Sequence, residues 1–344
     1  RHRVNVRFGD LLLAWYRNGH RDLPWRRATD PYRIWVSEIM LQQTRAAAVI
    51  PYYERFLARF PTVEALAAAT EPNVLALWSG LGYYSRARNL RRAAQQIVAA
   101  GGFPGEYGAI RGLPGIGDYT AAAIASMAFH LPHAVLDGNV MRVVARVRND
   151  AADIGAGRTR QRFRAIAQDW LDGNPPGLFN QALMELGATV CLPRNPLCLI
   201  CPVAACCLGR EEGVAAQLPV KLRKAVPVKI DGVLLVVRHR GRILLRQRPA
   251  AARRMAGFWD LPAPEDLPHV RVGKRLGEIR HTITHHHYTL TVRTATVRTA
   301  TVRAAETPAQ PAASIAFEWF RPGRMAEIPL STTARKALKA AGIL

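Results

Sequence analysis

Apolar residues recur at spacings of three and four through the first part of the chain. The recurrence is clearest in three segments, residues 8–16, 35–60 and 63–77. This spacing places the apolar side chains on one face of an α-helix, and strand patterns are nearly absent before about residue 210. Pro and Gly punctuate the helical segments, for example at 23–24, 61 and 80–82, where helices tend to end. The pattern therefore predicts an all-α domain over residues 1–215.

The pattern changes beyond a cysteine-rich segment that ends near residue 207. Residues 216–228 contain two prolines and several basic residues with little periodicity, which predicts an exposed linker. Segments 232–238, 242–247 and 288–302 are β-branched and alternating, and a helical pattern covers 331–341. We therefore expect an α+β domain over 229–344. Within it, residues 291–305 repeat the unit TVRTA with one change, and we attach no function to this repeat.

The chain is strongly basic. Its 344 residues include 48 Lys and Arg against 25 Asp and Glu, a net charge of +23, and the basic residues are mostly Arg, which suits phosphate contacts. This favours a nucleic acid as partner, although a basic proteome rich in Ala and Arg produces the same charge without function. No apolar stretch approaches the roughly 18–20 residues of a membrane span, and the first residues given lack the apolar run typical of a signal peptide. We expect a soluble intracellular monomer, in the cytoplasm or nucleoid if bacterial, with no membrane partner.

Four of the five cysteines are concentrated in one short segment. They follow the spacing C-x6-C-x2-C-x5-C, and Cys206 is the spare. A disulfide framework is disfavoured in a long, otherwise cysteine-free chain, so the density predicts a metal site. Zinc and an iron-sulfur cluster both suit four thiolates, and the spacing alone leaves both open. The candidate ligands are Cys191, Cys198, Cys201 and Cys207.

A glycine-rich turn precedes an Ala-rich helical segment at residues 111–120, RGLPGIGDYT. Gly115 and Gly117 allow a tight turn and expose amides at a helix N-terminus, where a phosphate is attracted. Taken alone, such a turn is most often only a helix cap.

Two carboxylates lie in settings that suit acid-base chemistry. Glu38 is flanked by apolar residues in WVSEIMLQQTR, which predicts a partly desolvated carboxyl with a raised pKa. Asp137, in VLDGNVMRV, lies at a predicted helix start, where amide donors favour the ionised form. Glycosidic cleavage needs such an acid and such a stabilising carboxylate. Taken singly, Glu38 also reads as a solvated helix residue and Asp137 as an N-cap.

Several motifs in order closely resemble the MutY family of adenine DNA glycosylases, within the endonuclease III superfamily. They are LPWR at 23–26, SEIMLQQT at 37–44, GLGYYSRARNL at 80–90 and LDGNVMR at 136–142. The LPGIG turn resembles the helix-hairpin-helix of that superfamily, which grips the DNA backbone. The cysteine spacing resembles its 4Fe-4S loop, here residues 191–207, which favours iron over zinc. Together the matches cover nearly the whole first domain.

The resemblance implies roles for individual residues. Glu38 would protonate the adenine leaving group, Asp137 would stabilise the oxocarbenium ion or its covalent adduct, and Asn139 would hold that carboxylate and the sugar. Tyr119 stands where bifunctional relatives carry a Lys nucleophile, and a phenol forms no imine, so we expect monofunctional chemistry. Further residues match positions that contact DNA: Gln43 and Tyr83 as intercalating residues, Arg26 near the extruded base, and Arg194 in the cluster loop.

The second domain resembles the Nudix-like C-terminal domain of the same family, on GFWDLPAPED at 257–266. It lacks the glutamate-rich Nudix helix, so we expect recognition rather than hydrolysis. The Phe-Ser-His motif with which the family reads 8-oxoguanine corresponds here to Ile283, Thr284 and His285. The hydroxyl and the His are retained, and the aromatic ring is lost.

The resemblance implies hydrolytic removal of adenine from double-stranded DNA in which it is paired with 8-oxoguanine or, less efficiently, guanine. One alternative keeps the fold and changes the base, giving a thymine mismatch glycosylase, against which the second domain argues. The other is a DNA-binding protein without catalysis, which would need neither Glu38 and Asp137 nor Tyr119.

Overall fold

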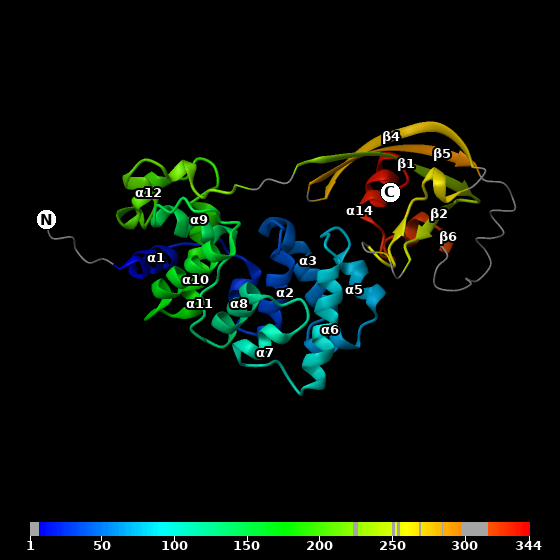
Figure 1. The fold of residues 1–344 in the computed structure, drawn as a ribbon. Coiled ribbons are helices and arrows are strands. Elements are labelled where there is room, and N and C mark those ends of the chain that lie inside the picture. The colour runs from blue at the N-terminus through cyan, green and yellow to red at the C-terminus, as the bar shows by residue number, and fades with distance from the viewer. Residues whose placement is uncertain are drawn as a thin grey trace. The chain divides into compact units, whose positions relative to one another are not determined.

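The computed structural model describes residues 7–222, 226–249, 252, 255–267, 270–283, 285–296 and 316–344 (Figure 1). Contacts between Cα atoms divide the chain into two units. The first consists of Arg1–Ala67 and Arg92–Lys224, and the second of Ala68–Arg91 and Ala225–Leu344. The short segment 68–91 therefore groups with the C-terminal part of the chain, although it lies within the helical region in sequence. The domain boundaries near 215 and 229 stay a prediction.

Helices make up the regular structure of the described chain up to residue 222, which confirms the all-α prediction. The α-helices are α1 Phe8–Arg17, α2 Pro31–Leu41, α3 Ala46–Arg59, α4 Val63–Ala68, α5 Glu71–Trp78, α6 Ser85–Ala99, α7 Tyr107–Gly112, α8 Asp118–Ala128, α9 Gly138–Val147, α10 Gly157–Leu171, α11 Pro176–Thr189 and α12 Leu208–Glu211. Short 3-10 helices lie at η1 Pro24–Arg27, η2 Cys198–Ile200, η3 Ala204–Cys206 and η4 Ala215–Gln217.

The core of the first unit fixes the helices that carry the candidate site. Helix α11 packs against α1, α8 and α9, and α2 packs against α8. Apolar side chains from these helices, among them Leu12, Ile124, Val143 and Leu183, are fully or almost fully buried. Because Glu38 lies on α2, Tyr119 on α8 and Asp137 at the start of α9, this packing sets the positions of all three.

The second unit contains a mixed sheet of six strands: β1 Val228–His239, β2 Arg242–Gln247, β3 Trp259–Asp260, β4 Arg271–Ile283, β5 His286–Thr296 and β6 Ala316–Phe320. The order is β3-β2-β1-β5-β4, and β6 pairs with β2. β1 runs parallel to β5, and β4 and β5 form an antiparallel hairpin that closes at the pair Ile283 and His286. Helix α14, Thr332–Ala340, contacts β4, so the predicted α+β domain is confirmed.

The predicted linker needs correction, and part of the TVRTA repeat lies outside the described residues. Part of the predicted exposed linker is packed: Leu218 is 4% exposed, and its carbonyl accepts a hydrogen bond from Arg146 Nε at 3.0 Å. The apolar side chain of Leu218 packs into the core of the first unit. The proline-containing sequence around it has little periodicity and does not indicate this burial. Within the repeat, residues 291–296 form the last part of β5, and residues 297–305 lie outside the described residues.

Among the described helices, none has the length and apolar character needed to cross a membrane.

Candidate active site and cysteine loop

Glu38 is a buried carboxyl with a tyrosine as its hydrogen-bond partner. It is 4% exposed, and the hydroxyl of Tyr119 donates to its Oε2 at 2.7 Å. Burial raises the pKa of Glu38 from 4.5 to about 7, against the hydrogen bond from Tyr119, while the negative charge of Asp137 raises it further. Near neutral pH this carboxyl is therefore present in both protonated and ionised forms, which a proton donor requires.

Asp137 caps helix α9 from the extended residue before it. Its Oδ1 accepts from the Val140 amide at 2.7 Å, and its Oδ2 accepts from Asn139 Nδ2 at 3.0 Å. These donors are those that the sequence predicts. Burial nevertheless raises the pKa of Asp137, and the hydrogen bonds oppose that rise only in part. The predicted donors are therefore present, and burial opposes their effect on the pKa of Asp137.

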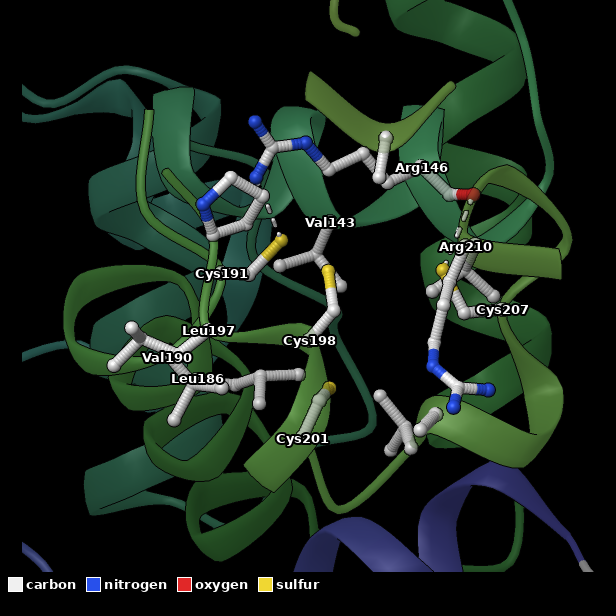
Figure 2. Close-up of a pocket in the computed structure, with 15 residues that line it drawn as sticks. Val143, Arg146, Leu186, Val190, Cys191, Leu197, Cys198, Cys201, Cys207 and Arg210 are labelled. Carbon is white, nitrogen blue, oxygen red and sulfur yellow. Dashed lines mark hydrogen bonds between the residues drawn. The ribbon is translucent and has the colours of Figure 1, made fainter. Parts of the chain in front are cut away.

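Four cysteines line one pocket with apolar walls at the end of the first unit (Figure 2). They are the predicted set, Cys191, Cys198, Cys201 and Cys207, and the spare Cys206 is not part of the lining. The buried guanidinium of Arg146 lies at its edge, where Nη1 donates to Cys191 Sγ at 3.3 Å and to the Leu192 carbonyl at 2.7 Å. Within the described parts of the chain, no three Cys, His, Asp or Glu residues come close enough to share a single ion.

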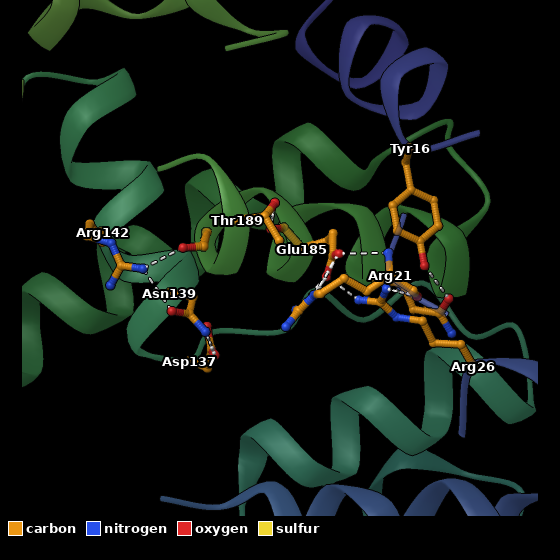
Figure 3. A network of polar contacts seen from close by, with 10 residues as sticks. Tyr16, Arg21, Arg26, Asp137, Asn139, Arg142, Glu185 and Thr189 are labelled. Carbon is orange, nitrogen blue, oxygen red and sulfur yellow. Dashed lines mark hydrogen bonds and ion pairs between the residues drawn. The ribbon is translucent and has the colours of Figure 1, made fainter. Parts of the chain in front are cut away.

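A second arginine connects the cysteine loop to Asn139, the side chain that donates to Asp137 (Figure 3). Arg142 donates from Nε to the Cys191 carbonyl at 2.7 Å, and from Nη2 to Asn139 Oδ1 at 2.8 Å and the Gly187 carbonyl at 2.7 Å. Helices α9 and α11 meet closely here, since a Cβ on Gly187 would lie 2.6 Å from Asn139 Cβ. The orientation of Asn139, and through it that of Asp137, therefore depends on both Arg142 and the small residue at 187.

Glu185 is a buried acid that sequence reasoning missed. Its side chain is 2% exposed and is paired with Arg21 and Arg26 (Figure 3). Burial would raise its pKa, but the hydrogen bonds from the two arginines outweigh burial and hold the pKa at about 2. Arg26, predicted near an extruded base, has its guanidinium 5.6 Å from the ring centroid of Tyr16 and is 10% exposed.

The predicted DNA-contacting residues differ in their backbone geometry. Gln43 and Tyr83 both have left-handed φ angles, +57° and +48°, which are uncommon for residues with a side chain. Gly115 has a φ of +79°, whereas Gly117 has an ordinary φ of −98° as the N-cap of α8. The tight turn of the hairpin therefore requires glycine at 115, and its backbone conformation does not require glycine at 117.

The last candidates lie in two loops. Arg194 is exposed between the first two cysteines. His285 lies in the β4–β5 turn, with its ring centroid 4.1 Å from that of His286. Thr284 lies outside the described residues.

Comparison with known proteins gives two family matches. Residues 36–168 match the HhH-GPD superfamily of base excision DNA repair proteins, and residues 232–340 match the NUDIX domain. The human adenine DNA glycosylase is 46% identical over 222 residues, which cover 61% of this chain and 41% of the human protein. The adenine DNA glycosylase of Buchnera aphidicola from Acyrthosiphon pisum is 36% identical over 70% of this chain and 69% of its own length. The chain thus spans less than half of its human relative.

Solved structures resemble the helical part. A thermostable thymine-DNA glycosylase matches with a TM-score of 0.53 and 29% identity, over 60% of this chain and 95% of its own. A trapped endonuclease III–DNA covalent intermediate matches with a TM-score of 0.51 and 19% identity, over 60% of this chain and 94% of its own. The second likeness concerns the fold alone.

Proposed function

We propose that this chain, which belongs to the adenine DNA glycosylase family, hydrolyses the bond between adenine and deoxyribose in mispaired DNA. One observation carries the proposal: a buried carboxyl, Glu38, with a pKa of about 7 is hydrogen-bonded to Tyr119 and lies near enough to Asp137 to feel its charge. A pair of carboxyl groups with perturbed pKa values suits glycosidic cleavage, in which one group donates a proton and the other stabilises a cation.

In the proposed reaction, Glu38 in its acid form donates a proton to a ring nitrogen of adenine. The glycosidic bond breaks and its electron pair leaves with the base, so that positive charge develops on the sugar. Asp137, held by Asn139 and the Val140 amide, stabilises that charge as a carboxylate. Water then adds its hydroxyl to the sugar carbon and passes its proton to the Glu38 carboxylate, which restores the acid form. Tyr119 cannot form an imine, so the product is an abasic site with an uncut strand.

The proposed substrate is double-stranded DNA with adenine opposite 8-oxoguanine or guanine, bound by a monomer. The net charge of +23 supports binding to phosphate, and the exposed Arg194 and the Gly115 turn supply candidate contacts. The NUDIX match at 232–340 supports a role for the second unit in reading the opposing base. His285 lies at the β4–β5 turn, where a hairpin tip can contact DNA.

We propose that the four cysteines hold a 4Fe-4S cluster. They line one pocket, and in a cluster each of the four thiolates would bind one iron. A single zinc ion with its sulfurs about 2.3 Å away is the competing occupant. When bound, the cluster would serve as a structural link between Cys191 and Cys207. Analysis of the purified protein should give about four irons and four sulfides per chain, and stoichiometric zinc would contradict this proposal.

The thymine mismatch alternative rests on the likeness to a thymine-DNA glycosylase over 60% of the chain. The C-terminal NUDIX match and the identity with adenine glycosylases favour adenine. The non-catalytic alternative gives no reason for burying Glu38 against Tyr119, because a buried carboxyl with a raised pKa is costly to the folded state.

Single-turnover base release tests the proposal. Duplexes with adenine opposite 8-oxoguanine or guanine, and with thymine opposite guanine, are incubated with excess enzyme, with and without alkali. We expect strand breaks only after alkali, and only from the adenine strands. Glu38→Gln should bind DNA but lose at least about a thousandfold of the rate, whereas Glu64→Gln, on an exposed carboxylate, should keep it. Full activity of Glu38→Gln would contradict the proton-donor role.

A further inference from the structure

The loop that carries Tyr83 adopts an unusual backbone conformation. Three of its residues have left-handed φ angles: Gly80 at +113°, Gly82 at +71° and Tyr83 at +48°. Tyr83 is 40% exposed, while Trp78 and Tyr84 on either side of the loop are buried. A non-glycine residue in this region persists only where its surroundings hold it. The contacts around the loop therefore decide where the exposed ring of Tyr83 points.

Some of these contacts come from the neighbouring helices. Trp78 Nε1 donates to the Gly82 carbonyl at 3.1 Å, and Arg86 Nη2 donates to the Leu81 and Gly82 carbonyls at 3.3 Å each. The guanidinium of Arg86 also lies 5.4 Å from the centroid of the Tyr83 ring. These bonds fix the inner side of the loop and leave its two ends to be held by other groups.

The two ends are held by residues of the C-terminal part of the same unit. At the first end, Ser79 Oγ donates to the Leu330 carbonyl at 3.1 Å and accepts from Arg335 Nη2 at 2.9 Å. At the other end, the ring of Tyr84 lies 4.0 Å from that of Phe258, centroid to centroid. Ser79 is 9% exposed, and Leu330 and Phe258 are fully buried, so both attachments exclude water.

The C-terminal side of this attachment is itself fixed by hydrogen bonds. Ser331 caps helix α14 by accepting from the Ala334 amide at 2.9 Å, and its Oγ donates to Asp260 Oδ1 at 2.9 Å. The Ser331 amide donates to the Trp259 carbonyl at 2.9 Å. Leu330 and Arg335 flank this cap, so the groups that hold Ser79 are placed by the start of α14 and by strand β3.

We propose that Ser79 and Arg335 are positioning residues that set the loop for insertion of Tyr83 into DNA. The C-terminal part of the chain thereby contributes to extrusion of the target base through the protein, separately from any contact of its own with the opposing base. The inference rests on the proposed function, in which a residue fills the space left by the extruded adenine. Ser79→Ala removes both hydrogen bonds of this attachment, and Arg335→Met removes the one from Arg335 to Ser79. Both variants leave Tyr83, Glu38 and Asp137 unchanged.

The test is the rate of base extrusion in the full-length protein. 2-Aminopurine, a fluorescent adenine analogue, replaces the target adenine opposite guanine, and stopped-flow fluorescence reports its departure from the stack. We expect Arg335→Met to slow the fluorescence rise about three- to tenfold, as for the loss of one buried hydrogen bond, and Ser79→Ala to slow it at least as much. Because Ser79→Ala already removes the bond from Arg335, the double variant should be no slower than Ser79→Ala. Binding to a fully paired duplex should stay within about twofold, since phosphate contacts are untouched.

A matched control separates the attachment from the loss of charge. Arg324→Met removes an equally basic residue that pairs with Glu327 at the surface, and it should extrude the base at the wild-type rate. If the wild type gives no fluorescence change, the proposed function fails. If the wild type extrudes the base and both variants match its rate, the positioning proposal fails. The proposal also fails if the variants lose paired-duplex binding and thermal stability in proportion, because the contact is then only structural.

Discussion

Glu38 and Asp137 illustrate how burial and hydrogen bonding compete at a single carboxyl. Both groups have raised pKa values, with burial as the first cause. They differ in their donors: Glu38 has the single hydroxyl of Tyr119, whereas Asp137 has an amide and a carboxamide. The number of donors, rather than the depth of burial, therefore distinguishes the group suited to give a proton from the group suited to stabilise a cation.

The pKa of Glu38 predicts the pH dependence of base release. Because the acid form of Glu38 is the proposed proton donor, the rate should be level below pH 7 and fall about tenfold per unit at high pH, with a midpoint near the pKa of about 7. Single-turnover rates from pH 5.5 to 9 measure this profile. Glu64→Gln should leave the profile unchanged. A rate that rises through neutral pH would show that the required group acts as a base.

The same shift affects stability with a definite sign. The pKa of Glu38 rises from 4.5 to about 7 on folding, so the folded state binds the proton more tightly. The contribution of Glu38 to the free energy of unfolding is therefore fully present below pH 4.5 and is lost as pH rises through 7. The melting temperature of Glu38→Gln, taken as its difference from that of the wild type, should therefore be higher at pH 8 than at pH 5.

For single residues of the candidate site, the sequence predicts some features of the structure and gives no sign of others. The apolar neighbours of Glu38 in the sequence predict its burial, and the predicted start of a helix indicates that Asp137 is its N-cap. The hydrogen bond between Tyr119 and Glu38 joins residues 81 positions apart and depends on the packing of α2 against α8. Nothing local marks Glu185, a lone acid in an apolar helix, because its partners Arg21 and Arg26 reach it only through the fold.

At the scale of the elements, α9 and α11 approach each other closely at the candidate site. A Cβ on Gly187 would lie 2.6 Å from Asn139 Cβ and 3.2 Å from its carbonyl. Gly187→Ala should therefore displace Asn139, cost about 1–3 kcal/mol of unfolding free energy and slow base release more than it weakens DNA binding. Gly157→Ala, in α10 with nothing within 4 Å, is the control for thermal melts and rates. Unchanged kinetics in Gly187→Ala would mean that Asn139 does not need its present position.

The sequence predicts β2 and α14 to within one residue of their bounds, whereas β1 begins four residues before the predicted segment 232–238. The apolar side chains of β1 are buried in two cores, Leu234 and Val236 in one and Leu235 and Val237 in the other. β4 was missed because Arg271–Ile283 is largely polar and its first residues are mostly exposed. The pattern over 35–60 continues through residues 42–45, yet the structure separates α2 from α3 there, with Gln43 at a φ of +57°. Periodicity reports the buried face and does not report such a break.

At the scale of the whole molecule, the chain order and the contacts divide the protein differently. Residues 68–91 lie among the helices in sequence but group with residues 225–344 in space. The contacts of Ser79, Tyr84 and Arg88 with Leu330, Phe258 and Ala256 produce this grouping. A cut between the helical and the mixed parts would therefore remove the C-terminal partners of Ser79, Tyr84 and Arg88.

Hydrogen exchange on a shortened chain tests this division. In a chain that ends at Leu222, the amides of residues 79–88 should lose about tenfold or more of their protection, because a buried hydrogen bond and an aromatic pair are gone. Peptides from α8 keep their contacts within the first unit and should exchange as in the full chain, which controls for general unfolding. Equal protection of 79–88 in both chains would show that α5 and the loop are stable on the helical part alone. Selective loss would mean that residues 79–88 depend on the C-terminal part of the chain for their stability.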